Sequence, residues 1–145
     1  MQPKAFFVYG TLMRGEPNFE HHFGKRKIVE EYSAEVSGFE MYSMGSFPCC
    51  IATESNASLP PVKGRVIVVD DEDFEATLRA VDRLEGHPDF YRRIVVVPSH
   101  VSATKEPPPC WMYVLNAPGK VANLPRVWTN DWKKYLSNQP TVGAH

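Results

Sequence analysis

Residues 5–12 read Ala-Phe-Phe-Val-Tyr-Gly-Thr-Leu and hold the most informative pattern in this chain of 145 residues. The apolar run at residues 5–9 predicts a short strand, and the glycine after it predicts a tight turn. Because Gly10 has no Cβ, a ligand can approach the main chain closely there. Successive amides in such a turn can form a small nest that binds a carboxylate or a phosphate. A plain strand-to-loop turn shows the same pattern, so both interpretations stay open.

Residues 71–84 have the pattern of a helix. The acidic residues at positions 71–73 favour a helix N-terminus, because they oppose the positive end of the helix dipole. Apolar residues then recur at helical spacing and mark the face that should be buried, namely Phe74, Leu78 and Val81.

Glu85 lies four residues beyond Val81, so the buried stripe of this helix leads to a carboxylate. Gly86 follows directly, as expected where a helix stops. In the alternative, Leu84 completes the stripe and Glu85 is an ordinary hydrated residue at the helix end. A partly buried glutamate loses solvation, and the negative end of the helix dipole acts in the same direction, so its pKa should rise. Such a group is a competent general base and general acid.

An anion nest together with a tuned glutamate indicates an enzyme that acts on a small carboxylated substrate. With these two elements, the chain resembles the gamma-glutamylcyclotransferase-like superfamily, and within it the AIG2-like and gamma-glutamylamine cyclotransferase group. The resemblance covers residues 5–136 and is carried by these motifs, in order: Tyr9-Gly10-Thr11-Leu12, Gly38-Phe39-Glu40-Met41-Tyr42, Phe47-Pro48, Gly64-Arg65-Val66, Leu84-Glu85-Gly86-His87-Pro88, Tyr91-Arg92-Arg93 and Trp111-Met112-Tyr113-Val114.

The resemblance implies an α+β fold in which a small mixed-strand β-barrel with a few helices encloses one cavity. It implies that the loop formed by Tyr9, Gly10, Thr11 and Leu12 binds the α-carboxylate of the substrate through backbone amides. It assigns Glu85 as the catalytic acid and base and places Tyr91 at the pocket, although Tyr91 could instead be an ordinary strand residue. Members of the family release 5-oxoproline from a gamma-glutamyl compound, and they use no cofactor.

The substrate stays open at this stage. A free gamma-glutamyl amino acid, a gamma-glutamylamine and a larger acyl conjugate all fit, and so does removal of a gamma-glutamyl protecting group from a biosynthetic intermediate. Residues 99–109 and 116–126, which should choose among them, contain no motif that we can assign. A non-catalytic protein that holds a small carboxylate in the same cavity is the alternative function.

Composition agrees with one domain over residues 1–145, with its core at about residues 5–136 and a mobile tail after Leu136. The net charge of -1 gives no electrostatic reason to expect nucleic acid or an anionic membrane as partner. The sequence has no membrane-length apolar run and no signal-peptide pattern, so we expect a cytoplasmic protein. The oligomeric state is left undetermined by the sequence.

The remaining reactive residues give weaker evidence of a functional site. Cys49, Cys50 and Cys110 show no disulfide framework, and small buried apolar side chains are favoured over a catalytic thiol at Cys49-Cys50. The Glu20-His21-His22 triplet lacks further ligands at a recognisable spacing, so no metal site is expected. His87 could assist proton transfer, but the sequence His-Pro-Asp at positions 87–89 favours a turn.

Further strands are predicted by β-forming apolar runs at residues 65–70, 91–98 and 110–115. A cap at residues 129–131 precedes a short predicted helix that ends at Leu136. Strands and helices do not alternate regularly, which argues against a doubly wound sheet and for an irregular α+β or barrel arrangement.

Overall fold

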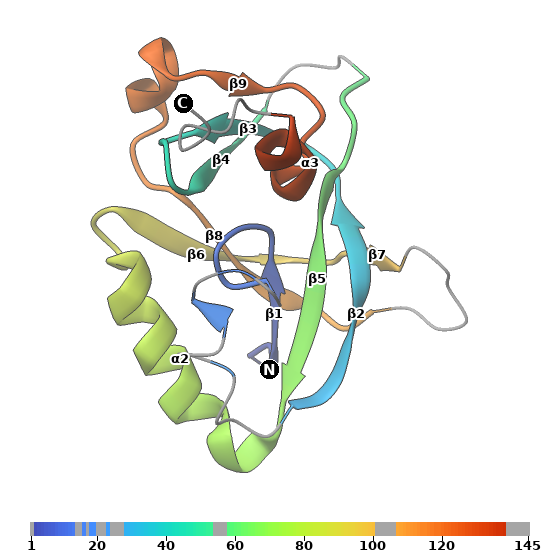
Figure 1. Ribbon diagram of the computed structural model, residues 1–145. Helices are drawn as coiled ribbons and strands as arrows, with labels where there is room; N and C mark the ends of the chain where they lie inside the picture. Colours follow the sequence, from blue (N-terminus) through green and yellow to red (C-terminus); the bar gives the residue numbers. More distant parts are fainter. Residues whose placement is uncertain are drawn as a thin grey trace, which may run out of the picture.

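The computed structural model describes residues 2–13, 16, 18, 19, 23, 28–53, 58–100 and 107–138. The larger of its two sheets has the strand order β6-β8-β1-β5-β2-β7 (Figure 1). Its strands are β1 (Ala5–Val8), β2 (Ile28–Val36), β5 (Val62–Val69), β6 (Tyr91–Val96), β7 (Ser99–His100) and β8 (Cys110–Leu115). The smaller sheet has the order β4-β3-β9, with β3 (Phe39–Ser43), β4 (Pro48–Ala52) and β9 (Arg126–Val127). The helices are α2 (Asp71–Glu85), the 3-10 helix η1 (Pro118–Asn123) and α3 (Trp132–Ser137).

The larger sheet is mixed, because β1 pairs antiparallel with β5 and parallel with β8. The fold is α+β, as expected. The prediction of a barrel is wrong, because the described strands do not form a closed sheet. Strands β6 and β7 stand at opposite ends of the larger sheet and do not pair with each other, so the sheet stays open. Strand β7 has two residues, which pair with β2, and α2 packs beside β6 at the other end (Figure 1).

The central strands β1 and β8 bury both of their faces. Alternate residues enter two hydrophobic clusters, one on each side of the larger sheet: Phe6 and Trp111 belong to the cluster beside α2, and Phe7 and Met112 to the cluster beside the smaller sheet. A strand covered on both faces has a continuous apolar sequence rather than an alternating one. This explains why residues 5–9 and 110–115 were recognisable as strands from sequence.

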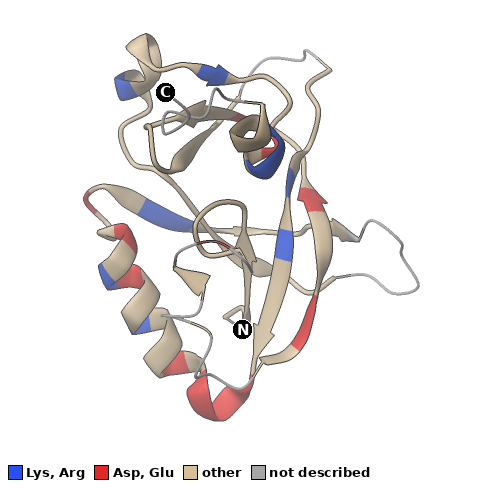
Figure 2. Cartoon of the chain, viewed as in Figure 1, with Lys and Arg blue, Asp and Glu red and all other residues tan. Residues whose placement is uncertain are grey.

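Helix α2 confirms the prediction for residues 71–84 and extends it by one residue. Its buried positions include Phe74, Leu78 and Val81. Acidic residues cluster at its N-terminal end (Figure 2). The helix ends at Gly86, whose φ of 65° lies in the left-handed region that favours glycine. The termination point therefore places Glu85 in the last helical position.

Helix α3 begins at the predicted cap, since the Asp131 side chain accepts a hydrogen bond from the Lys134 N–H at 3.1 Å. Just before it, Asn130 has a φ of 54° and is 1% exposed. Its side chain bonds to backbone atoms of Phe39 and Met41 on β3 and of Pro60, which precedes β5. Asn130 thus joins the C-terminal segment to the smaller sheet. Residues 139–145 of the predicted mobile tail lie outside the described residues.

The strand predicted at residues 65–70 is β5, which begins three residues earlier than predicted. The strand predicted at residues 91–98 is β6, which ends two residues earlier than predicted. One long strand, β2, had no counterpart among the predictions.

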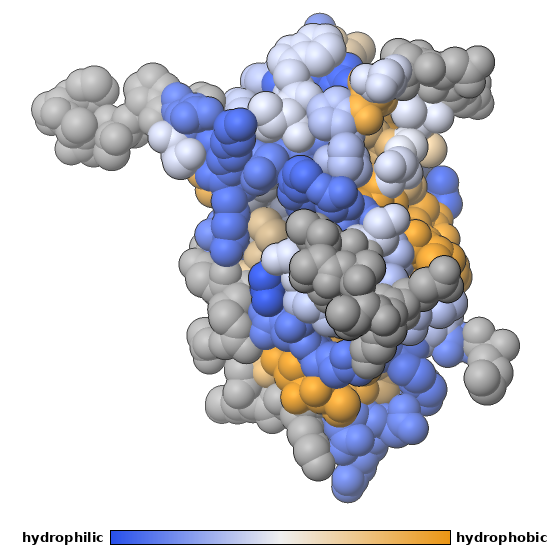
Figure 3. Space-filling model, turned by 90° about the vertical axis from the view of Figure 1, so that its right-hand side faces the viewer, coloured by the Kyte–Doolittle hydropathy of each residue, from blue (hydrophilic) through white to orange (hydrophobic). Residues whose placement is uncertain are grey.

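The surface beside β2 and β7 is mainly hydrophilic with small apolar areas (Figure 3). Within the described part of the chain, none of the helices is long and apolar enough to cross a membrane.

Candidate active site

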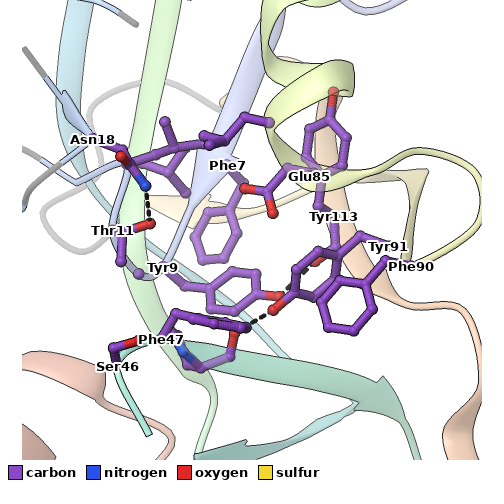
Figure 4. A pocket seen from close by; sticks show the side chains of 15 residues that line it. Phe7, Tyr9, Thr11, Asn18, Ser46, Phe47, Glu85, Phe90, Tyr91 and Tyr113 are labelled. Carbon is purple, nitrogen blue, oxygen red and sulfur yellow. Dashed lines mark hydrogen bonds between the residues drawn. The ribbon is translucent and has the colours of Figure 1, made fainter. Parts of the chain in front are cut away.

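A cavity of about 350 Å³ lies where the loop after β1, the start of β4, the end of α2 and the strands β6 and β8 meet (Figure 4). Its volume suits a small molecule. Its walls are mostly aromatic and apolar, with a few polar groups, and consist of Phe7, Val8, Tyr9, Gly10, Thr11, Leu12, Asn18, Ser46, Phe47, Pro48, Leu84, Glu85, Phe90, Tyr91 and Tyr113. All six site residues expected from the sequence, namely Tyr9, Gly10, Thr11, Leu12, Glu85 and Tyr91, are in this group.

The loop after β1 exposes backbone to the cavity. The carbonyl of Gly10 accepts a hydrogen bond from Met13 N–H at 3.0 Å, which closes a tight turn. A Cβ on Gly10 would stand 2.7 Å from Cγ and Cδ of Pro48, closer than real side chains come. Glycine is therefore required here by the close approach of β4 to the loop rather than by an unusual φ.

Asn18 holds Thr11 at two points. Its backbone N–H donates to the Thr11 carbonyl at 2.8 Å, and its Nδ2 donates to Thr11 Oγ1 at 2.9 Å. Within the described residues, the N–H groups of Thr11 and Leu12 donate no hydrogen bond. Both residues line the cavity, and backbone amides in such a turn can bind an anionic group. Asn18 was missed by sequence reasoning, because no motif connected it to the loop.

Glu85 reaches the cavity from the last turn of α2 (Figure 4). Burial raises the pKa of its carboxyl from 4.5 to about 7, because desolvation disfavours the charged form. The alternative, in which Leu84 completes the buried stripe, is wrong: Leu84 is 39% exposed, although part of it borders the cavity. The site therefore contains a carboxyl group suited to both accepting and donating a proton near neutral pH.

Tyr9 and Tyr91 converge in the cavity with Glu85 (Figure 4). The Tyr9 hydroxyl donates to the Tyr113 carbonyl at 2.5 Å, and the Tyr91 hydroxyl donates to the Pro48 carbonyl at 2.7 Å. A phenol has one proton to donate, so each oxygen has only acceptor capacity left for a ligand. Burial also raises the pKa of both phenols, which keeps them neutral.

An aromatic group lies at one side of the cavity. The rings of Phe90 and Tyr91 meet edge to face at 4.8 Å, and those of Phe47 and Phe90 at 6.3 Å. Sequence reasoning had assigned no site role to Phe47, Phe90 or Tyr113. Phe47 and Tyr113 stand in motifs used for the resemblance, but only the folded chain shows that they border the cavity.

The other candidates do not line the cavity or lie outside the described residues. His87 is in the turn after α2, where its Nδ1 accepts the N–H of Arg93 at 3.2 Å, as the turn interpretation predicted. All three cysteines are buried free thiols, and burial raises the pKa of Cys49 to about 11 and that of Cys110 to about 12. The described residues contain no cluster suited to a metal ion, and the Glu20-His21-His22 triplet lies outside them.

The model of the family described as gamma-glutamyl cyclotransferase, AIG2-like, matches residues 6–134 of this chain. The chain belongs to this family. Among the relatives of this cyclotransferase-family protein, a rat gamma-glutamylaminecyclotransferase is 35% identical over 97 residues, covering 60% of this chain and 58% of the relative. A protein of Methanocaldococcus jannaschii, provisionally named a gamma-glutamylcyclotransferase, is 36% identical over 93 residues, covering 60% of this chain and 65% of the relative. The matches thus span less than two thirds of each relative's length.

The fold of this cyclotransferase-family chain is also that of a solved structure. An AIG2-like protein from Mus musculus superimposes with a TM-score of 0.66 at 21% identity, covering 85% of this chain and 84% of the mouse chain. This similarity supports the mixed α+β architecture.

Proposed function

We propose that this protein is a gamma-glutamyl cyclotransferase that releases 5-oxoproline from a gamma-glutamyl amine or amino acid, with Glu85 as general base and then general acid. The observation that carries the proposal is the convergence of the Tyr9–Leu12 loop and Glu85 on one small cavity. Family membership and the names of the relatives support a cyclotransferase activity. They give no support to the alternative of a non-catalytic carboxylate-binding protein.

The loop is suited to hold the α-carboxylate of the substrate. The amides of Thr11 and Leu12 are available as donors, and the hydroxyl of Thr11, which already accepts from Asn18, can donate its own proton. Binding at this point fixes one end of the glutamyl chain. The α-amine, attached to the same carbon as the α-carboxylate, then lies within the cavity close to the loop.

Tyr9, Tyr91 and Glu85 are suited to receive that α-amine. The two phenol oxygens offer only lone pairs, which accept from an ammonium or amine N–H. The Glu85 carboxylate accepts the proton that the amine must lose before it can attack. These three groups therefore discriminate in favour of a positively charged or neutral nitrogen and against a second anion.

The reaction needs no group beyond the substrate and one acid and base. The amine nitrogen forms a bond to the γ-carbonyl carbon and closes the five-membered ring of 5-oxoproline. The bond from that carbon to the leaving nitrogen breaks, and Glu85 returns the proton to the leaving nitrogen. Since nucleophile and electrophile belong to one molecule, holding the chain folded supplies much of the rate enhancement.

The lining favours an amine over an α-amino acid as leaving group. Apart from phenols, Glu85 is the only ionisable side chain among the described lining residues, and these residues include no lysine, arginine or histidine. Among these described residues, a carboxylate on the leaving group would meet Glu85 without a compensating cation. The aromatic group of Phe47, Phe90 and Tyr91 suits an alkyl chain instead.

The test is a 5-oxoproline release assay with two matched substrates. Gamma-glutamyl-propylamine and gamma-glutamyl-α-aminobutyrate differ only by the carboxylate on the leaving group, and glutathione extends the panel. We expect release from the first substrate at a kcat/KM at least tenfold above the second. Release from none of the three contradicts the proposed function, and preference for the aminobutyrate compound contradicts the substrate assignment.

The variant Glu85→Gln tests the role of the carboxyl group. Glutamine keeps the shape but cannot transfer a proton, so kcat should fall by about 100-fold or more while substrate binding stays nearly intact. Binding is measured by isothermal titration calorimetry with a non-cleavable analogue. Full turnover by Glu85→Gln would rule out this mechanism.

A further inference from the structure

A cluster of charged and polar side chains borders the cavity at Tyr113 and includes Asp82, one helical turn before Glu85. The Asp82 carboxylate accepts from Arg93 Nε at 3.0 and 3.3 Å, and the Tyr113 hydroxyl also donates to it. Arg93 on β6 and Tyr113 on β8 are cross-strand partners in the larger sheet. Two adjacent strands therefore hold the last turn of α2 through one carboxylate.

Tyr113 connects this cluster to the substrate loop. Its side chain reaches Asp82, and its backbone carbonyl accepts the Tyr9 hydroxyl at 2.5 Å. Arg93 connects the cluster to the turn after α2, since its backbone N–H donates to His87 Nδ1. The cluster thus links the end of α2, the following turn and the loop after β1, which are the elements that place Glu85 and Tyr9.

The charges in the cluster are balanced and largely shielded from water. The side chains of Arg93 and Asp82 are 23% and 20% exposed, and the Arg93 guanidinium also lies 4.4 Å from the centre of the Trp111 ring. Asp82 and Glu85 are three residues apart on the helix, so their Cβ atoms are neighbours at roughly 5–6 Å. Arg93 is the cation that pairs with Asp82 within the described part of the chain, so without it the charge of Asp82 would face Glu85 uncompensated there.

We propose that Asp82, Arg93 and Tyr113 are positioning residues that fix the last turn of α2 against β6 and β8, so that the Glu85 carboxyl stays in the cavity, and that Arg93 shields Glu85 from the charge of Asp82. The effect on turnover rests on the proposed function. The effect on the ionisation of Glu85 does not, because it belongs to the protein without substrate.

The phenols and thiols near Glu85 do not obscure a change in the pKa of Glu85. Burial raises the pKa values of the neighbouring phenols and of the thiols of β4, so these groups stay neutral near pH 7. They are Tyr9 from the loop after β1, Cys49 and Cys50 from β4, Tyr91 from β6 and Tyr113 from β8. Arg83, which precedes Glu85 on α2, is exposed, and His87 follows in the turn.

The experiment is an NMR titration of the Glu85 side-chain carboxyl carbon in protein labelled with ¹³C-glutamate, with Glu85→Gln identifying the resonance. In Arg93→Gln, the pKa of Glu85 should rise by roughly one pH unit, because an unpaired like charge disfavours ionisation. In the double variant Asp82→Asn with Arg93→Gln, both charges are absent and the wild-type pKa should return. Arg92→Gln is the matched control, since Arg92 is the exposed neighbour on the same strand.

Turnover adds a second readout. The limb of the pH–rate profile that reports Glu85 should move to higher pH in Arg93→Gln. Tyr113→Phe keeps the charge balance but removes a bond to Asp82, so kcat should fall about tenfold while KM changes little.

The proposal is overturned if folded Arg93→Gln titrates like the wild type, or if Arg92→Gln shifts Glu85 equally. If Arg93→Gln does not fold, an unchanged kcat in Tyr113→Phe overturns it. Failure of the wild-type protein to release product would instead contradict the proposed function, and the titration would still decide the present inference.

Discussion

Replacing Glu85 with glutamine should stabilise the folded protein at pH 8 and change its stability much less at pH 5. Burial raises the pKa of Glu85 from 4.5 to about 7, so the folded state binds the proton more tightly than the unfolded chain. The resulting stabilisation is fully present below pH 4.5 and is lost as the pH rises through about 7. A buried glutamine stays neutral and avoids this loss.

The magnitude follows from the two pKa values. Each pH unit between them corresponds to 1.36 kcal/mol, so the variant should gain about 3 kcal/mol at pH 8 and about 1 kcal/mol at pH 5. These gains are differences in the free energy of unfolding between the variant and the wild type at the same pH. Carboxyl groups other than Glu85 cancel in that difference.

Urea unfolding followed by tryptophan fluorescence measures both values. The control is Glu75→Gln, the same substitution at an exposed position on the same helix, where it alters no desolvated group. An equal gain at both pH values, or a wild-type protein more stable than Glu85→Gln at pH 8, would refute the argument that Glu85 ionises in a desolvated position. The same experiment separates the acid and base role from stability, because a variant that loses turnover while gaining stability is folded.

Two further predictions concern Gly10 in the loop after β1 and Asn130 before α3. Gly10→Ala should lower kcat/KM about 10- to 100-fold in the release assay, because the added Cβ would collide with Pro48 and displace the loop. The control is Gly119→Ala, which should have no effect because an added Cβ there would meet no atom within 4 Å. Asn130→Ala should lower the free energy of unfolding by about 3 kcal/mol, roughly 1 kcal/mol for each lost bond to Phe39, Met41 and Pro60. A urea midpoint for Asn130→Ala equal to that of the wild type would show that these bonds contribute nothing net.

Several elements of the fold could be predicted because their signals are local. The helix over residues 71–84, the strand over residues 110–115 and the cap before α3 each depend on residues a few positions apart. Strand β2 was missed for a physical reason. It is rich in glutamate, and its acidic side chains are stabilised by partners on β5, as in the pairs Glu31–Arg65 and Glu35–Lys63, which are about thirty residues away in sequence.

The barrel expectation failed because closure of a sheet depends on which strands become its edges. In the described residues β6 ends beside α2 and β7 is short, so the larger sheet stays open while the smaller sheet covers one of its faces. Neither fact has a signature within any single strand. The cavity that the family resemblance implied is present nevertheless, because it is formed where the loop after β1 meets the end of α2 and does not require a closed sheet.

The sequence by itself determined that residues 5–12 form a strand and a glycine turn and that the helix carrying Glu85 ends at Gly86. Periodicity and backbone constraints are sufficient for both. Only the tertiary structure decided that this carboxyl and this turn share one cavity, that burial brings the pKa of Glu85 close to 7, and that Asp82 lies between Arg93 and Tyr113. These properties depend on desolvation and on contacts between distant segments, which exist only once the strands have paired.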